Sequence, residues 1–375
     1  MSERNMKILE LCNYSAGIDG VFARVKEESI RLAKKGHGVK IFSSNIEKGS
    51  NKIANPEDKI DSVEIKRFPA KKIGGESFMS WNFEKEALKY NPDVIICHSY
   101  RHTHTTKALK IAKKLNCKVF LVTHAPFDRK DTRSFVANIV VYFYDNFIGR
   151  KTLPKFNKVL TITRWENPFL HKIGIKNENI EYLTNGIPEE FFKSKKLAKE
   201  ENKILFLGRI APIKNLETVI KAMPLIKDQG MKFEIVGPPE SGYLFKLKLL
   251  IKELKLENRI IFSPAIFDIK QKIKKIDSAK IFILPSISEG MPQGLVEGMA
   301  RGKITIASNN RASRDLIEDK KNGYLFPIGD YKALSELIDS VSSKSQEKIR
   351  KQTLESVKKF SWDKIIEKIE SLINS

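Results

Sequence analysis

The chain is poor in cysteine. Its 375 residues contain three, at Cys12, Cys97 and Cys117. An odd and sparse set argues against a disulfide framework and favours a reducing compartment. None of the three has the spacing of a metal site, so we expect no bound metal. Long apolar runs are also missing: nothing approaches the ~20 apolar residues of a membrane span. Residues 1–12 lack the apolar stretch of a signal peptide. We therefore expect a cytoplasmic protein.

Acidic residues are outnumbered, with 45 Asp and Glu against 68 Lys and Arg, which gives a net charge of +23. Any anionic partner feels such an excess. The charge is dispersed, with no zinc-finger spacing and no basic arm, so we expect no nucleic-acid partner. Two basic helical patterns, residues 102–118 and 244–258, place lysines beside apolar stripes. They are typical of a solvated helix face, or of peripheral contact with an anionic membrane at its cytoplasmic side; both readings stay open.

The length exceeds what one core usually supports, so two domains are expected. Short apolar segments alternate with helical patterns, which is typical of parallel sheets covered by helices on both faces. The first set of predicted strands is 7–12, 39–43, 63–68, 94–98, 119–123, 159–163 and 180–183. The second set is 204–207, 233–236, 260–262, 281–284, 304–307 and 324–326.

The sequence therefore predicts an α/β protein with two Rossmann-like, doubly wound domains, at residues 1–192 and 203–360. Between the two sets, residues 193–202 read KSKKLAKEEN, which is charged and has no apolar periodicity. This segment is the predicted interdomain linker. Residues 361–375 form an amphipathic helical pattern that begins near Trp362.

The segment PSISEGMPQGLVEGMA at residues 285–300 places Glu289 just past the carboxyl end of a predicted strand. A helical pattern begins at Gly294. We expect the amides of residues 293–296 to point out of this helix N-terminus and to bind phosphate. The carboxylates of Glu289 and Glu297 would accept hydrogen bonds from hydroxyl groups. A nucleotide sugar carries both phosphates and hydroxyls.

Two cations flank the turn of another strand, in GRIAPIKNL at residues 208–216. Lys214 lies near a predicted helix start, where the helix dipole disfavours a cation unless an anion is bound. Arg209 can grip phosphate oxygens in a bidentate manner, and a lysine acts on them as a point charge. Two solvated surface cations are the alternative, with about equal weight.

Together these residues resemble the retaining glycosyltransferases of family four. Their GT-B fold has two Rossmann-like domains that face a central cleft. The resemblance rests on GRIAPIKN, on the glutamate pair of EGMPQGLVE with seven residues between, on MARGKITIAS, and on NGYLF at residues 322–326. It implies that Arg209 and Lys214 bind the donor diphosphate, that Glu297 holds the ribose hydroxyls, and that Glu289 contacts the transferred sugar. It also implies donor contacts from the backbone of Gly290, Met291, Pro292, Gly294 and Leu295.

In the first domain the resemblance assigns His124 to the reaction centre and places Gly20 near the donor phosphates. A loop histidine that only caps a strand is the alternative for His124. Asp19 departs from the glycine pair that is usual in the family. The pair Asn185 and Gly186 resembles the turn that leads out of the first domain, and the final helix is expected to cross back onto that domain.

The apolar segment at residues 133–149 is predicted to be a buried helix. The alternative is that part of it lines the acceptor side or touches a lipid acceptor. Its sequence, RSFVANIVVYFYDNFIG, combines aromatic and aliphatic residues, with basic residues at both flanks.

The resulting hypothesis is transfer of a hexosyl group from a nucleoside diphosphate sugar to an acceptor hydroxyl, on a glycan or on a lipid-linked molecule. The anomeric configuration is kept by same-face attack, without metal or other cofactor. His124, Arg209, Lys214 and Glu289 are the expected catalytic residues. A glycoside hydrolase that uses the glutamate pair and a non-catalytic sugar-nucleotide-binding protein are the alternatives. Uridine, guanosine and adenosine donors are all open.

Overall fold

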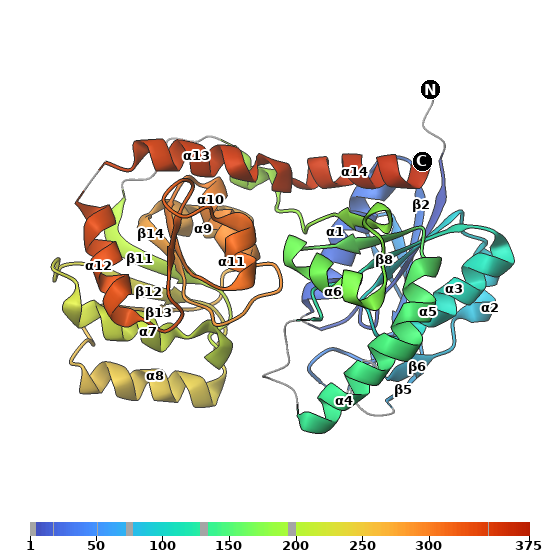
Figure 1. The fold of residues 1–375 in the computed structure, drawn as a ribbon, viewed down its shortest axis with the longest axis horizontal. Coiled ribbons are helices and arrows are strands. Elements are labelled where there is room, and N and C mark those ends of the chain that lie inside the picture. Colours follow the sequence, from blue (N-terminus) through green and yellow to red (C-terminus); the bar gives the residue numbers. More distant parts are fainter. Residues whose placement is uncertain are drawn as a thin grey trace. The chain divides into compact units, whose positions relative to one another are not determined.

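The computed structural model describes residues 5–17, 19–50, 52–72, 78–127, 134–193, 200–343 and 345–375. The chain forms two compact units (Figure 1). Unit 1 comprises Met1–Asn185 and Trp362–Ser375, and unit 2 comprises Gly186–Ser361. Each contains a mainly parallel sheet with helices on it, so the predicted α/β fold class is confirmed. Among the described residues, no helix is both long enough and apolar enough to cross a membrane.

The sheet of unit 1 has the order β10-β9-β8-β7-β1-β2-β4-β3. All pairs are parallel except β3 with β4. The strands are β1 Lys7–Leu11, β2 Gly38–Ser44, β3 Glu57–Ile60, β4 Val63–Phe68, β7 Val94–His98, β8 Lys118–Val122, β9 Lys158–Thr161 and β10 Ile180–Tyr182. The helices are α1 Gly20–Lys34, α2 Glu84–Tyr90, α3 Thr103–Leu115, α4 Phe135–Phe143, α5 Arg150–Thr152, α6 Asn167–Ile173 and α14 Trp362–Asn374. All three cysteines lie in this unit as free thiols.

The sheet of unit 2 is wholly parallel, with the order β13-β12-β11-β14-β15-β16. Because β11 is its first strand, the order reverses between β11 and β14, and ligands of open α/β sheets bind at such a switch point. The strands are β11 Glu201–Leu207, β12 Lys232–Val236, β13 Ile260–Ser263, β14 Ala279–Leu284, β15 Ile304–Ser308 and β16 Tyr324–Phe326. The helices are α7 Leu216–Ala222, α8 Ser241–Glu253, α9 Ile269–Asp277, α10 Gln293–Ala300, α11 Arg311–Leu316, α12 Tyr331–Ser342 and α13 Glu347–Val357.

Three short strands are absent from the sequence-based prediction: β3, β5 (Ala70–Lys72) and β6 (Met79–Trp81). The edge strand β3 reads EDKI and has no buried residue. It therefore has no apolar alternation by which a strand is recognised in sequence. Charged residues on an edge strand also discourage pairing with other chains.

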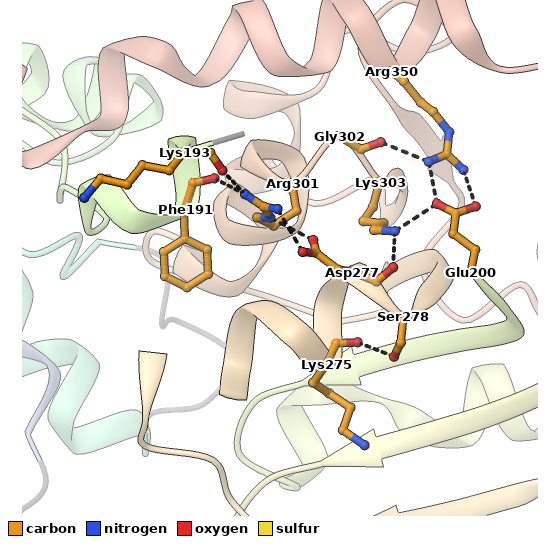
Figure 2. Close-up of polar contacts among 10 residues, drawn as sticks. All are labelled: Phe191, Lys193, Glu200, Lys275, Asp277, Ser278, Arg301, Gly302, Lys303 and Arg350. Carbon is orange, nitrogen blue, oxygen red and sulfur yellow. Dashed lines mark hydrogen bonds and ion pairs between the residues drawn. The ribbon is translucent and has the colours of Figure 1, made fainter. Parts of the chain in front are cut away.

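Both ends of the predicted linker are bonded within unit 2 (Figure 2). Arg301 donates to the carbonyl oxygens of Phe191 at 3.1 Å and Lys193 at 2.8 Å. The Glu200 carboxylate accepts from Lys303 at 2.8 Å and from Arg350 at 2.7 Å. Residues 194–199 lie outside the described residues.

The chain passes from unit 1 to unit 2 between Asn185 and Gly186 and returns between Ser361 and Trp362. The sequence analysis instead expects the first domain to end at residue 192. The charged composition of residues 193–202 is the reason why a linker is predicted there. One of these charges, that of Glu200, instead forms ion pairs with Lys303 and Arg350. The position of the crossover is therefore set by contacts that composition does not reveal.

The last helix, α14, belongs to unit 1. Its Glu370 lies 3.1 Å from Lys35, and the carbonyl oxygen of Ile373 accepts a hydrogen bond from Lys118 at 2.9 Å. Its buried side chains are Trp362, Ile365, Ile366, Ile369, Glu370 and Ile373. Helix α14 thus completes the core of unit 1 from the far end of the chain.

The prediction of a buried helix at residues 133–149 is wrong. The segment forms α4 and a π-helical turn, Tyr144–Gly149, but no residue of α4 is buried, and only Gly149 of the turn is. Arg133 lies outside the described residues. Apolar composition usually indicates burial, but it does not say whether the rest of the fold covers the helix.

Candidate functional site

Glycines bring the elements around the switch point of unit 2 into close contact. A Cβ on Gly237, which follows β12, would lie 1.9 Å from the carbonyl oxygen of Gly208, which follows β11. A Cβ on Gly294 would lie 3.0 Å from the carbonyl oxygen of Leu207, and one on Gly298 would lie 2.6 Å from the Phe282 ring. Helix α10 therefore rests directly on β11 and β14, which places its first turn at the carboxyl ends of both strands.

Lys214 and Glu289 meet at this switch point. The Lys214 Nζ lies 2.6 Å from the Glu289 Oε1, and the Ser286 hydroxyl donates to the same oxygen at 2.6 Å. The two loops that carry the pair are joined by a hydrogen bond of 2.9 Å from the Ile287 amide to the Ile213 carbonyl. Both side chains are largely buried. The structure thus brings together a cation and a carboxylate that the sequence analysis expects at the donor.

The other two charged donor residues have partners elsewhere. Arg209 is exposed and lies 2.7 Å from Glu240. Glu297 is buried and lies 2.5 Å from Lys272, a residue that the sequence analysis does not single out. Within the described part of the chain, the Glu297 Oε2 is buried and has no hydrogen-bond partner. Burial raises the pKa of Glu297, and Lys272 opposes that rise. This oxygen is an acceptor that a ligand hydroxyl could satisfy.

The expected row of amides at the start of α10 is wrong for three of its four members. The Gln293 amide donates to the Met291 carbonyl at 3.0 Å. The amides of Leu295 and Val296 both donate to the Pro292 carbonyl, at 3.0 and 3.3 Å. The helix begins with a tight turn, and that turn satisfies its own donors. For Gly294 the expectation stays a prediction.

The remaining expected donor contacts lie in the same region. Gly290, Met291 and Pro292 form the loop between β14 and α10. Leu295 is buried in the core of unit 2, and its amide is the one already bonded to the Pro292 carbonyl.

In unit 1, His124 follows β8 and takes part in a chain of hydrogen bonds. Its Nε2 lies 3.0 Å from the Nδ1 of His98, and the Nε2 of His98 lies 2.7 Å from the Oε2 of Glu10. His124 and Ala125 both have left-handed backbones, with φ of 59° and 51°. Strained backbone of this kind in non-glycine residues often marks a functional site.

Glu166 holds the strained turn in place. Its Oε2 accepts hydrogen bonds from the Thr123 hydroxyl at 2.5 Å and from the Ala125 amide at 3.0 Å. Its Oε1 accepts from the amides of Ile162 at 2.9 Å and Thr163 at 3.1 Å. A buried carboxylate with this many donors positions the backbone on both sides of His124.

The protonation states of the chain follow from burial. Burial raises the pKa of Glu10 to about 8 and lowers that of His98 to about 4. Burial and the neighbouring His98 also lower the pKa of His124. At neutral pH both histidines are therefore uncharged and Glu10 carries a proton. Glu10 then donates to His98, His98 donates to the Nε2 of His124, and the Nδ1 of His124 carries the hydrogen.

Glu10, Glu28 and His98 place one ligand atom each within 4.8 Å of one another, as a metal site would require. The Arg24 guanidinium, however, lies 3.0 Å from Glu28 and already supplies a positive charge there. Arg24 also donates to the side chain of Asn185 at 3.0 Å. These contacts fit a hydrogen-bonded network that ties α1 to the end of unit 1.

Gly20 is the first residue of α1, and Asp19 is its N-cap: the Asp19 carboxylate accepts a hydrogen bond from the Phe22 amide at 3.1 Å. Aspartate is among the preferred residues at this position. The departure from a glycine pair is thus explained by helix capping.

The chain was compared with protein families and with known proteins. The family described as glycosyl transferases group 1 matches residues 188–360, and the family described as glycosyltransferase family 4 matches residues 18–191. An uncharacterized glycosyltransferase of Haemophilus influenzae is 31% identical over 215 residues, which cover 56% of this chain and 56% of that protein. The chain thus spans about half the length of several curated relatives that it matches.

Two further likenesses extend over most of the chain. The alpha-monoglucosyldiacylglycerol synthase of Streptococcus pneumoniae is 24% identical, over 84% of this chain and 73% of that protein. The crystal structure of HepE from Anabaena in complex with UDP and glucose superimposes with a TM-score of 0.73 and 16% identity, over 99% of this chain and 100% of that one. The second likeness shows that the fold is shared.

Proposed function

Because the chain belongs to the glycosyl transferases group 1, we propose that it transfers a sugar from a nucleoside diphosphate donor to an acceptor hydroxyl, with retention of the anomeric configuration. The observation that carries this proposal is the meeting of Lys214 and Glu289 at the switch point of unit 2. A family of transferases gives no support to the hydrolase alternative.

In the proposed bound state Lys214 exchanges its carboxylate partner for the donor diphosphate, and Glu289 turns to hydroxyls of the transferred sugar. Arg209, at the exposed end of its loop, gives up Glu240 for the same diphosphate. Glu297 uses its unpartnered oxygen to accept a hydrogen bond from a ribose hydroxyl. At Lys214, Glu289 and Arg209 an internal ion pair is thus replaced by a charge-assisted contact to the ligand.

The proposed reaction is a same-face displacement. The C–O bond to the diphosphate breaks, the acceptor oxygen attacks the same face of the sugar, and the leaving phosphate takes the acceptor proton. We assign His124 a hydrogen bond at the reacting sugar, as the family resemblance implies. The route needs no protein nucleophile and no divalent metal, because cationic side chains stabilise the leaving diphosphate.

Replacing Lys214 with alanine tests the proposal. Negative charge grows on the diphosphate as the bond breaks, so turnover should fall about 100-fold or more while donor binding weakens less. Turnover is measured as release of nucleoside diphosphate, and binding by thermal shift. The control is Lys221→Ala, an exposed lysine of α7, which should keep full activity. Unchanged turnover in Lys214→Ala would refute the assignment.

The donor base and the acceptor are identified by screening. Each nucleoside diphosphate that binds the folded protein raises its melting temperature, because binding stabilises the folded state by RT ln(1 + [L]/Kd). UDP is tested first, because HepE, of the same fold, was crystallised with it; GDP and ADP follow. Diacylglycerol glycosides and soluble glycans are the two acceptor classes to compare, since one relative is a monoglucosyldiacylglycerol synthase. Tight donor binding with no transfer to any acceptor would favour a non-catalytic binding protein.

A further inference from the structure

Helix α4 and the π-helical turn after it expose eight large apolar side chains on unit 1. Phe135 is 80% exposed and Val136 is 68% exposed. We call the following set the α4 face: Phe135, Val136, Ile139, Val140, Tyr142, Phe143, Phe147 and Ile148. All eight lie within residues 135–148, whereas exposed apolar residues on soluble proteins are usually scattered singly. Such a concentration marks contact with another body.

The spacing of these residues aligns them along one side of the helix. Phe135, Ile139, Phe143 and Phe147 follow one another at intervals of four, so they form a row along the axis. The rings of Phe143 and Phe147 are stacked, with centroids 5.7 Å apart. At a rise of ~1.5 Å per residue the row is about 18 Å long. Such a flat stripe suits an extended apolar surface better than a single pocket.

The α4 face carries no charge. Between residues 134 and 149 the only ionisable acid or base other than tyrosine is Asp145. Its carboxylate is bonded to Arg101 at 2.7 Å and to Tyr100 at 2.9 Å, so it is already neutralised by the body of unit 1. An uncharged, partly aromatic surface can enter the boundary between lipid head groups and acyl chains.

Cations follow directly after the apolar face. Arg150, Lys151 and Lys155 are exposed. Arg150 also donates to the carbonyl of Lys172 at 3.2 Å, which brings a further exposed lysine alongside. Two copies of a chain with a net charge of +23 repel one another, whereas an anionic partner is attracted to these cations. Anionic phosphates would neutralise them.

We propose that the α4 face docks on the surface of an anionic lipid bilayer. Its apolar side chains lie in the interfacial layer, and Arg150, Lys151 and Lys155 contact lipid phosphates. Docking concerns unit 1 alone and does not depend on sugar transfer. It does agree with an acceptor carried on a lipid, because it would hold the enzyme where such an acceptor is found.

The test is binding to vesicles of phosphatidylcholine with and without phosphatidylglycerol, measured by co-sedimentation at low and high salt. The wild-type protein should bind anionic vesicles and lose affinity as salt increases. The double variant Phe143→Ser, Phe147→Ser should lower that affinity about a hundredfold, because each buried ring contributes about tenfold. The control is Leu225→Ser, Ile328→Ser, two exposed apolar residues of unit 2, which should bind as wild type.

A second pair of variants separates charge from apolar contact. Arg150→Ser, Lys151→Ser should weaken binding to anionic vesicles and make it less dependent on salt. The exposed lysines of α13, changed as Lys348→Ser, Lys351→Ser, are the matched control. Wild-type protein that fails to sediment with anionic vesicles would overturn the proposal, and so would equal losses in either control. A dimer in analytical ultracentrifugation that dissociates in the Phe143, Phe147 variant would instead make the face a contact between copies. Donor-induced thermal shifts, measured on the same variants, report on donor binding separately.

Discussion

Glu10 is a carboxylic acid in the centre of the unit 1 sheet, and its ionisation opposes folding. Its pKa is raised by burial from 4.5 to about 8 in the folded protein. Between these values the folded state binds more protons than the unfolded state, so the free energy of unfolding falls as pH rises. One such group contributes a slope of at most about 1.4 kcal/mol per pH unit. Glu166, whose pKa burial raises to about 7, acts in the same direction.

Glu10→Gln should therefore make the stability of unit 1 less dependent on pH. The amide is neutral at every pH and can donate to His98 as the protonated acid does, so the decrease between about pH 5 and about pH 8 should become shallower. Urea unfolding at several pH values, followed by tryptophan fluorescence, measures the free energy of unfolding of unit 1. Fluorescence reports on this unit because Trp81, Trp165 and Trp362 are the only three tryptophans of the sequence and all lie in unit 1. The exposed Glu178→Gln serves as control. Equal slopes in wild type and Glu10→Gln would contradict the raised pKa.

At this scale the sequence predicts residue types and loops, but not partners. Lys214 and Glu289 are both recognisable from the turns that carry them, and the structure joins them. His98 and Glu10, by contrast, are 88 positions apart, and they meet because of the register between β1 and β7. Lys272 is one of several lysines in α9, and nothing in its spacing indicates a contact with Glu297.

At the scale of elements, the position of α10 depends on a helical glycine. A Cβ on Gly298 would lie 2.6 Å from Phe282, so Gly298→Ala forces the helix away from the sheet. We expect unit 2 to lose about 1–3 kcal/mol of stability and donor binding to weaken, because Glu297 is the preceding residue. Far-UV circular dichroism follows the unfolding, and fluorescence identifies the transition of unit 1.

The matched control is Gly242→Ala in α8, where a Cβ would have no neighbour within 4 Å. That substitution should be neutral or stabilising by up to about 1 kcal/mol, since alanine favours helix. If Gly298→Ala and Gly242→Ala change stability and donor binding equally, close packing of α10 is not what positions Glu297 and the loop between β14 and α10.

Elements with a clear apolar run or a clear apolar alternation are predicted well from sequence. The strands 63–68, 94–98 and 324–326 coincide with β4, β7 and β16. The buried helix predicted at 133–149 fails because hydrophobicity reports only the tendency to avoid water. Whether a helix is covered depends on tertiary contacts that the pattern does not contain.

At the scale of the molecule, unit 1 needs the end of the chain. Five large apolar side chains of α14 are buried, at roughly 1.5–3 kcal/mol each, which rivals the ~5–15 kcal/mol that stabilises a typical domain. A chain that stops after Ser361 should therefore lose the folded structure of unit 1, measured by Trp81 and Trp165 fluorescence, while unit 2 still binds nucleoside diphosphate. Ile369→Ala, a milder change, should cost about 2–5 kcal/mol. A truncated chain with native fluorescence would show that α14 is dispensable.

The two-domain architecture is visible in the sequence as two series of strands, but the boundaries are not. They depend on which contacts each segment makes, such as those of Arg301 with the carbonyls of Phe191 and Lys193. Charged composition alone cannot distinguish a connecting segment from one that is fastened to a domain.

The division of unit 1 between the two ends of the chain also constrains how the protein is made. A ribosome delivers the residues of β1 before those of unit 2, and the residues of α14 after them. The sheet of unit 1 therefore lacks the cover of α14 while unit 2 is synthesised. Unit 2 can already fold during that time. Unit 1 is thus the first unit to begin synthesis and the second to be completed. Until α14 is made, the surface that α14 covers in unit 1 is open to chaperones.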